Sequence, residues 1–357
     1  MIMSEIPKKM RGVYLNGHGS FDMLELRDYI PVPTPGPNEV LIKVGAAAVN
    51  NTDINTRKAW YSKSDGDSKD ASWSGTPIKF PRIQGADVCG RIVAVGKLVN
   101  NNRLNERVLV EPSIRVAQGK VLEQPWYFGS ECDGGFAEYT VVDSRHAYSI
   151  NSKLSDIELS SFPYSYSTAE NLLTKAHVTD SDTVLVTGAS GGVGSAAIQL
   201  AKARGAKVIG ITSPLKSDNV LNLGADSVLM RSDSVVKELG ENGIDVVIDL
   251  VGGKQWPDLL DVLKPFGRYA VAGAIGDPHV KLDIRTLYLK DLSLFGCTVL
   301  DENVFSNLVK HIENENISPL VAETYPLEDI VKAQQAFLKK KHTGKIILKV
   351  NKEIKLE

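Results

Sequence analysis

The hydrophobic positions of residues 1–150 form short runs of the kind that predicts β-strands. Runs of Val, Ile and Leu stand between turns rich in Gly, Pro and Asn. The segment Ile30–Asn38 carries four prolines, and we expect a turn-rich edge or loop there, because proline cannot donate to a strand ladder. The predicted strands are Val40–Val44, Gly90–Val95, Arg107–Val110 and Ala137–Val142.

The pattern changes near residue 182 to alternating strands and helices. Apolar residues at helical spacing over Gly194–Arg204 follow the first β-branched run of this region. Strands that alternate with helices or loops predict an α/β unit with a doubly wound parallel sheet. The predicted strands are Thr183–Thr187, Lys207–Thr212, Ser227–Met230, Ile244–Leu250, Arg268–Ala272 and Leu292–Cys297.

The remaining segments contain one further helix, one terminal strand and one long polar stretch. Apolar residues share a helical face over Leu327–Lys341, and Lys345–Val350 has the pattern of a strand. The stretch between Tyr61 and Phe80 is polar and without period. A loop of this length is either functional or a tolerated surface insertion.

Length, charge and cysteine content narrow the class of protein. A chain of 357 residues suggests two domains. The 43 acidic and 41 basic residues leave a net charge of −2, which argues against a nucleic-acid binder. The three cysteines are far apart, so neither a disulfide framework nor a four-cysteine zinc site is expected. Without an apolar leader or an apolar run of membrane-spanning length, we expect a cytoplasmic protein with no membrane partner.

The most specific local signal is a glycine-rich turn within Val184–Ala197. A strand runs into the turn and a helix follows it. Glycine lets the backbone approach a pyrophosphate, whose charge a helix N-terminus favours. The strict G-x-G-x-x-G pattern is not met, because Ala189 follows the first glycine. The residues predicted to bind a dinucleotide here are Gly188, Ser190, Gly191, Gly192, Val193 and Gly194.

Two other functions use similar turns. A nucleoside-triphosphate loop requires a lysine that this turn lacks. Residues 188–192 also match the G-x-S-x-G nucleophile elbow, which would make Ser190 the nucleophile of a serine hydrolase. Its partners would be Asp249 and either His279 or His311. The strand-rich pattern before the turn speaks against this alternative, since a hydrolase elbow follows several βα units.

The end of the second predicted strand of this unit indicates the cofactor. A binder of NAD usually places an acid there for the ribose hydroxyl. This chain has Thr212–Lys216 instead, with no acid before Asp218. Ser213 and Lys216 can donate to a 2′-phosphate, and Arg231 follows the next strand. The pattern favours NADPH.

These features resemble the medium-chain dehydrogenase/reductases, and in particular their zinc-independent quinone oxidoreductase branch. The resemblance implies a GroES-like β-barrel catalytic domain over residues 1–150 and 299–357, interrupted by a Rossmann dinucleotide-binding domain over 151–298. It also implies a homodimer. The similar motifs, besides the glycine turn, are V-N-N-T-D-I (49–54), Q-G-A-D-V-C-G (84–90), D-G-G-F-A-E-Y (133–139), L-G-A-D (223–226), I-D-L-V-G-G (248–253) and H-T-G-K-I-I-L (342–348).

The chain departs from the zinc-using alcohol dehydrogenases of this superfamily at the metal ligands. By the resemblance, Asn50 stands in place of the first cysteine ligand, Ala86 and Asp87 replace a His-Glu pair, and Tyr164 lies near the third ligand. Asn, Ala and Tyr do not supply the ligand set of catalytic zinc. We therefore expect no metal.

Hydride transfer without a metal favours acceptors that delocalise charge. A simple ketone becomes a localised alkoxide, whereas a quinone or an α,β-unsaturated carbonyl becomes an enolate-type anion that hydrogen-bond donors can stabilise. The predicted donors are Asn50, Tyr61 and Tyr164, with Asp53 orienting them. Asp53 could instead cap a helix that starts at Ile54, and Tyr164 could be a packed core aromatic.

The resemblance also implies further cofactor contacts. Thr168 should touch the nicotinamide ribose or a phosphate, and Lys345 matches a basic position near the adenine-side phosphate. Further candidates follow strand ends, where an open parallel sheet presents its ligand: Val251, Gly252, Gly273, Ala274 and Ile275. A protein that binds the cofactor without catalysis remains the alternative to a reductase.

Overall fold

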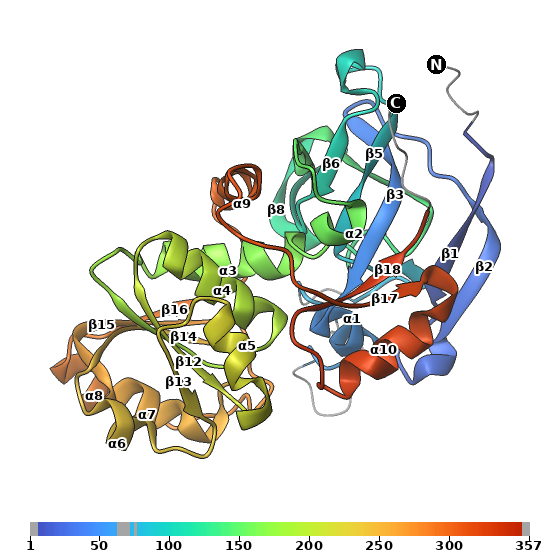
Figure 1. Cartoon of the computed structure of the whole chain (residues 1–357). Coiled ribbons are helices and arrows are strands. Elements are labelled where there is room, and N and C mark those ends of the chain that lie inside the picture. Colours follow the sequence, from blue (N-terminus) through green and yellow to red (C-terminus); the bar gives the residue numbers. More distant parts are fainter. Residues whose placement is uncertain (1–5, 63–71, 75–76, 352–357) are drawn as a thin grey trace. The chain divides into compact units, whose positions relative to one another are not determined.

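The computed structural model describes residues 6–62, 72–74 and 77–351, which form two compact units (Figure 1). The first unit comprises Met1–Tyr164 and Pro319–Glu357, and the second comprises Ser165–Ser318. The chain therefore leaves the first unit, builds the second and returns. The divisions at 164/165 and 318/319 fall later along the chain than the expected boundaries at 150/151 and 298/299.

The first unit is built around a sheet of seven strands in the order β10-β6-β5-β3-β18-β17, with β9 paired to β3. The long strand β3 pairs antiparallel with β5, β9 and β18. Its side chains are almost all buried, which explains its nearly continuous apolar sequence. The strands are β3 (Glu39–Val49), β5 (Asp87–Val95), β6 (Arg107–Val110), β9 (Tyr139–Asp143), β10 (Ala147–Ser149), β17 (Val321–Pro326) and β18 (Lys345–Lys349).

Smaller elements complete this unit and share its apolar core. A sheet in the order β2-β1-β4 and a separate hairpin β7-β8 add further strands. The core includes side chains of β3, β5, β6 and α10. The elements are β1 (Lys9–Leu15), β2 (Leu24–Pro31), β4 (Arg82–Ile83), β7 (Ser113–Ala117), β8 (Lys120–Tyr127), α1 (Asn51–Arg57), α2 (Asp156–Leu159) and α10 (Ile330–Leu338).

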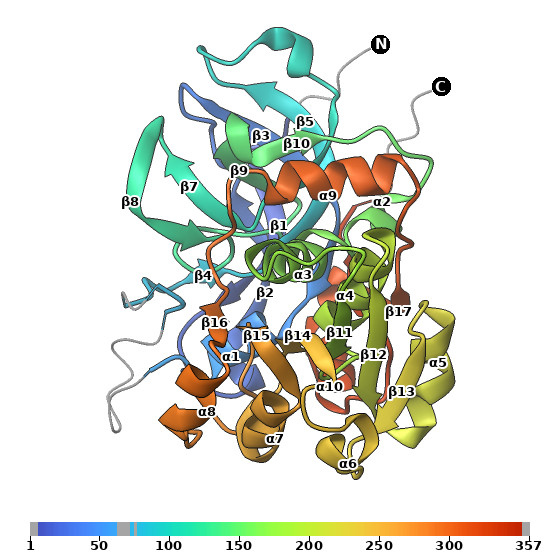
Figure 2. The ribbon, with the colours of Figure 1, turned by 90° about the vertical axis from the view of Figure 1, so that its left-hand side faces the viewer.

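The second unit contains a six-stranded, wholly parallel sheet in the order β13-β12-β11-β14-β15-β16 (Figure 2). The strand order reverses between β11 and β14, which is where an open parallel sheet binds its ligand. The strands are β11 (Thr183–Val186), β12 (Lys207–Thr212), β13 (Ser227–Met230), β14 (Ile244–Asp249), β15 (Leu263–Val271) and β16 (Ser293–Gly296).

Helices pack against both faces of this sheet, because successive residues of a strand point to opposite sides. Leu185 and Ile209 pack in one cluster with Trp256 of α7. Gly210, the next residue of β12, faces Ile198 of α4 and Val220 of α5 instead. Contacts with the strands come from α4 (Gly192–Ala203), α5 (Ser217–Asn222) and α7 (Trp256–Asp261). The other helices from Pro163 onward in this part of the chain are α3 (Pro163–Lys175), α6 (Val235–Leu239), α8 (Ile284–Leu289) and α9 (Val304–Glu313).

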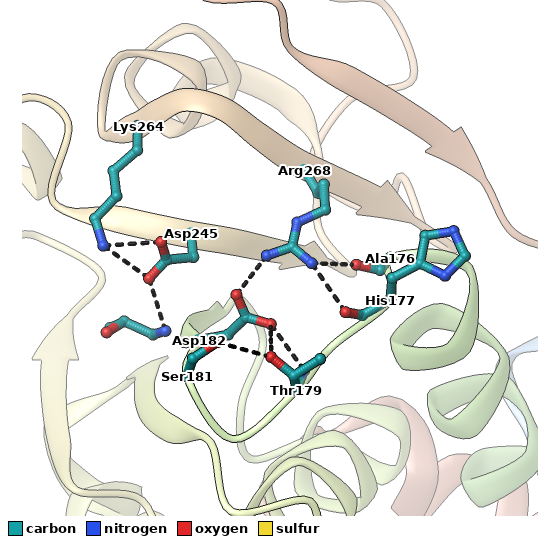
Figure 3. Close-up of polar contacts among 9 residues, drawn as sticks. Ala176, His177, Thr179, Ser181, Asp182, Asp245, Lys264 and Arg268 are labelled. Atoms are coloured by element: carbon teal, nitrogen blue, oxygen red, sulfur yellow. Dashed lines mark hydrogen bonds and ion pairs between the residues drawn. The ribbon is translucent and has the colours of Figure 1, made fainter.

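Ion pairs link the strands near their amino ends (Figure 3). Arg268 of β15 pairs with Asp182 and donates to the carbonyls of Ala176 and His177. Asp245 of β14 accepts from the Thr183 amide at 2.9 Å and from the Lys264 ammonium at 2.8 Å. These side chains satisfy one another, so this edge of the sheet serves structure.

The strand pattern and the two-domain α/β fold class predicted from the sequence are confirmed, with longer strands than expected at β3 and β15. The predicted helix over Leu327–Lys341 is shorter and spans Ile330–Leu338. Most of the polar stretch between Tyr61 and Phe80 lies outside the described residues. Within the described residues, the helices are too short or too polar to cross a bilayer.

Candidate functional site

The register of three neighbouring strands gathers polar side chains at one place in the first unit. Ala48 of β3 pairs with Asp87 at the start of β5. On the other side of β3, Val49 pairs with Ile346, the residue after Lys345 at the start of β18. Asn50 directly follows β3, so Asn50, Asp87 and Lys345 become neighbours although up to 295 positions separate them.

These three side chains form a buried hydrogen-bonded network. The Lys345 ammonium lies 2.8 Å from Asp87 Oδ2 and donates to Asn50 Oδ1. The Asn50 amide nitrogen donates to Asp87 Oδ2 at 2.8 Å and to the Ala48 carbonyl at 3.3 Å. Asp87 also accepts the backbone N–H of Tyr164 through Oδ1. The Lys345 and Asp87 side chains are only 4% and 0% exposed, so the pair compensates two charges withdrawn from water.

Asp53 joins this network through the start of α1. Its Oδ2 accepts the backbone N–H of Asn50 at 2.7 Å. The Gln84 side chain donates to the Asp53 carbonyl at 3.0 Å. Complete burial raises the pKa of Asp53 to about 7, although the Asn50 N–H and the nearby Lys345 charge act in the opposite direction. Asp53 is therefore a carboxyl group that titrates near neutral pH.

Two tyrosines lie beside these groups. The Tyr61 hydroxyl donates to Thr52 Oγ1 at 3.2 Å. Burial raises the pKa of Tyr61 and, more strongly, that of Tyr164, and the Asp53 charge adds to both shifts. The Tyr164 ring meets Tyr127 edge to face at 5.6 Å and lies 5.8 Å from the Lys345 ammonium. Both hydroxyls therefore stay protonated at neutral pH and can act as donors.

The structure brings Asn50, Asp53, Tyr61 and Tyr164 into one neighbourhood but changes two of their expected roles. Both N–H groups of the Asn50 side chain are engaged within the network, so Asn50 positions Asp87 and Lys345 rather than offering a free donor. Asp53 does act at a helix start, as the capping alternative expected. The helix α1 begins at Asn51, however, and not at Ile54, so Asp53 is its third residue and not its cap.

Lys345 is the residue whose expected role differs most. Its ammonium is committed to Asp87 and Asn50 inside the first unit, which does not support a contact with the adenine-side phosphate. From the sequence, Asp87 was recognised only as part of the replacement for a His-Glu ligand pair. The only sequence feature that could have indicated a buried role for Lys345 is its position at the start of the apolar run K-I-I-L. Its partners are identified only by the strand register.

The glycine turn of the second unit joins β11 to α4. Gly188 has a φ of +58°, a conformation that glycine adopts without strain. A Cβ on Gly194 would lie 2.3 Å from the Gly188 carbonyl oxygen, so the first helical turn packs directly on the turn before it. Gly191 is the N-cap of the 12-residue helix α4. The first N–H groups of such a helix lack intrahelical partners and suit an anion.

A buried carboxylate fixes the neighbouring turn after β14. Asp249, which is fully buried, accepts from the Thr187 hydroxyl at 2.6 Å and from the Val251 N–H at 2.9 Å. It also accepts from Gly252 N–H and the Tyr269 hydroxyl. This link between the ends of β11, β14 and β15 holds the backbone that was predicted to contact the cofactor. Sequence analysis did not identify this role of Asp249.

The predicted 2′-phosphate residues follow adjacent strands. Ser213 follows β12 and Arg231 follows β13, whose terminal residues Thr212 and Met230 are paired. Burial lowers the pKa of Lys216, and the nearby Arg231 charge lowers it further. Two cations therefore lie close together at the carboxyl ends of these strands, a position that suits a phosphate group.

The remaining cofactor candidates occupy the same unit. Val251 and Gly252 follow β14, while Gly273, Ala274 and Ile275 follow β15. Gly273 is required by packing, because a Cβ there would lie 2.5 Å from the Leu250 carbonyl oxygen. Thr168 lies on α3 and is half-buried.

The contacts of the second unit contradict the serine hydrolase alternative. Asp249 is occupied by Thr187 and Tyr269. His279 is 94% exposed beside Asp277, and His311 contacts Asn316. Ser190 is buried. In the described part of the chain, no hydrogen bond links this serine to either histidine.

Within 6–62, 72–74 and 77–351, no three His, Cys, Asp or Glu side chains are grouped in a way that could hold a metal ion. At the Asn50 position the available groups are an amide, an ammonium and a carboxylate already paired with it.

Two family models match separate parts of the chain, and known proteins are similar to it over nearly its whole length. Residues 36–152 match the alcohol dehydrogenase GroES-like domain, and residues 192–314 match a domain described as zinc-binding dehydrogenase. Human quinone oxidoreductase is 30% identical over 355 residues, covering 96% of this chain and 98% of that protein. Acryloyl-coenzyme A reductase of Metallosphaera sedula is 29% identical over 350 residues, covering 95% and 99%. A solved structure from Sinorhizobium meliloti 1021, classed provisionally as an alcohol dehydrogenase, has a TM-score of 0.89 and 43% identity, covering 97% of this chain and 98% of that one.

Proposed function

The chain belongs to the medium-chain dehydrogenase/reductase superfamily, and we propose that it is an NADPH-dependent, metal-independent oxidoreductase that reduces quinones or α,β-unsaturated carbonyl compounds. The observation that carries this proposal is the Lys345–Asp87–Asn50 network. An amide and an ammonium are not zinc ligands, and Asp87 is already neutralised by Lys345. Although one matched family is described as zinc-binding dehydrogenase, we therefore propose no zinc ion for this chain.

NADPH is the cofactor that the second unit fits best. Backbone N–H groups after Gly191 would bind the pyrophosphate. Ser213, Lys216 and Arg231 would surround a 2′-phosphate, since β12 ends without an acid to accept from a ribose hydroxyl. When bound, the reduced nicotinamide supplies the hydride. The chain's own residues bind and orient it.

The donors of the first unit suit an acceptor that spreads negative charge. Tyr164 has a protonated hydroxyl with a raised pKa, so it would stabilise an enolate-type anion by hydrogen bonding but is a weak acid. The Tyr61 hydroxyl, which donates to Thr52 Oγ1, would have to exchange that partner in order to contribute. A localised alkoxide would require stronger polarisation. The relatives named quinone oxidoreductase and acryloyl-coenzyme A reductase support the same acceptor class.

A matched pair of acceptors tests the proposal. We expect the protein to oxidise NADPH with 1,4-benzoquinone and with cyclohexenone, whose double bond is conjugated to its carbonyl. Cyclohexanone, the saturated control, should give no turnover. Reduction of cyclohexanone at a similar rate would contradict the acceptor class. Tight NADPH binding without oxidation by any compound would support the alternative of a non-catalytic cofactor-binding protein.

We also propose that the protein is a cytoplasmic homodimer. Its three cysteines are unpaired, which suits a reducing compartment. The edge strand β16 and the helix α8 expose Leu294, Tyr288 and Leu289, with exposed fractions of 39%, 59% and 70%. Burial of such side chains in a second copy is favourable. Light scattering of the purified protein should give twice the mass of the chain, and Leu289→Glu should shift it toward the monomer.

A further inference from the structure

The first unit contains a cavity of about 400 Å³ that shares no lining residue with the Asn50–Tyr164 neighbourhood. It is lined by residues of three sheets: β1 and β2 of one, the β7-β8 hairpin, and β9 of the large sheet. Its volume falls within the ~300–1,000 Å³ of small-molecule sites. We propose that this cavity binds a small, uncharged and mainly apolar molecule that carries one hydroxyl or carbonyl group.

The walls of the cavity are mostly apolar and preformed. Ile30, Ile83 and Ile114 contribute side chains that are no more than 4% exposed. Trp126 and Tyr139 add aromatic surface. Apolar and aromatic walls with few polar groups are typical of ligand sites, because they gain free energy when an apolar body displaces water.

Strand β9 supplies hydrogen-bonding groups to this apolar space. All five of its residues, Tyr139–Asp143, line the cavity. Among the described strands, β9 pairs only with β3, so the peptide groups along its other edge belong to no ladder. Thr140 is 3% exposed, and its hydroxyl has no hydrogen-bond partner in the structure. The Thr140 hydroxyl is shielded from the cavity, so the unpaired peptide groups of β9 are the groups that a ligand with one polar group would satisfy.

The charges around the cavity exclude anions. Its lining includes the carboxylates of Glu39, Asp133 and Asp143, and no lysine, arginine or histidine lines it among the residues that the structure describes. Asp133 and Asp143 are paired with arginines that do not line the cavity. An anionic group entering this space would lose hydration and meet like charges. The preferred occupant is therefore neutral.

Binding here is non-covalent. Cys132 also lines the cavity, but burial raises the pKa of its thiol to about 12. A thiol that remains protonated at neutral pH is a poor nucleophile. The site therefore recognises its ligand by shape and hydrogen bonding.

Calorimetry with two matched aromatic probes tests the site on the full chain saturated with NADP⁺. We expect 2-naphthol to bind with one-to-one stoichiometry and 2-naphthoate, which has the same rings and a carboxylate, to bind at least about tenfold more weakly. Ala117→Phe, which adds a ring to the cavity wall, should abolish binding.

The surface variant Ala322→Phe on β17 serves as the control for Ala117→Phe and should not change binding. Soaking crystals with 6-bromo-2-naphthol provides a measurement that does not depend on the variants, since the anomalous signal of bromine should lie in the cavity. A signal elsewhere, equal binding of naphthoate, or displacement of 2-naphthol by benzoquinone would overturn the proposal. None of these outcomes depends on turnover, so the proposed reductase activity is tested separately.

Discussion

The two regions assigned to function are built on opposite principles. In the first unit, Asn50, Asp87 and Lys345 are buried side chains that satisfy one another. At the carboxyl edge of the second unit's sheet, the contacts proposed for the cofactor come from glycine backbone and from cations at strand ends. The first region is stabilised by its own side chains, whereas the proposed role of the second depends on the cofactor. Substitutions should therefore reduce stability in the first region and cofactor affinity in the second.

The largest expected effect is on stability in the first unit. Lys345→Met retains length but leaves the buried Asp87 without its partner, which should lower the free energy of unfolding by about 3–5 kcal/mol. The control, Lys202→Met, breaks a pair with Asp226 whose side chains are 33% and 36% exposed, and should cost less than about 1 kcal/mol. Urea unfolding followed by circular dichroism measures both. Similar losses in the two variants would contradict the network, and adding Asp87→Asn to Lys345→Met should recover part of the loss.

The next effect concerns the glycine turn of the second unit. Gly194→Ala places a Cβ 2.3 Å from the Gly188 carbonyl oxygen, so the turn must shift. We expect NADPH affinity to fall about 10–100-fold, with little change in the fold of the first unit. Gly296→Ala is the control, since nothing lies within 4 Å of a Cβ there. Fluorescence titration with NADPH compares them, and unchanged affinity in Gly194→Ala would separate the turn from cofactor binding.

A smaller effect should separate the two forms of the cofactor. Lys216→Ala removes a cation near Arg231 and should weaken NADPH about tenfold, with NADH affinity unchanged. Parallel titrations with both cofactors give this ratio. An equal loss for NADH would mean that Lys216 does not contact the 2′-phosphate.

A pH-dependent effect on stability comes from Asp53. Its pKa is raised to about 7 from an ordinary value of 3.8, so the folded chain holds a proton that the unfolded chain releases between about pH 4 and pH 7. The free energy of unfolding should therefore fall as pH rises through this window, by about 1.4 kcal/mol per unit, and level off above it.

Asp53→Asn removes this proton while its side-chain oxygen can still accept from Asn50. The difference in unfolding free energy between wild type and Asp53→Asn should therefore change between pH 5 and pH 7. The surface variant Asp180→Asn should follow wild type throughout. A difference that is constant with pH would show that Asp53 does not titrate in this window.

Local sequence was sufficient for the elements that carry their own signals. We could predict the glycine turn and the strands around it because each depends on neighbouring residues. The absence of an acid after β12 is read directly from the sequence. The partners of Lys345 were not, since they depend on the registers of β5, β3 and β18. The same registers bring Asp87 to the Asn50 side chain, so the engagement of its amide nitrogen could not be predicted either. The start of α1 at Asn51 was missed because Asp53 was interpreted as a cap rather than as the third helical residue.

The central claim is hydride transfer from NADPH without a metal ion, and a single-turnover measurement tests it most directly. Protein dialysed against a chelator, with its metal content measured, is mixed with one equivalent of NADPH and an excess of 1,4-benzoquinone. We predict full oxidation of NADPH at a rate that neither chelation nor added Zn²⁺ changes. Loss of the reaction after chelation, with recovery on addition of Zn²⁺, would contradict the account.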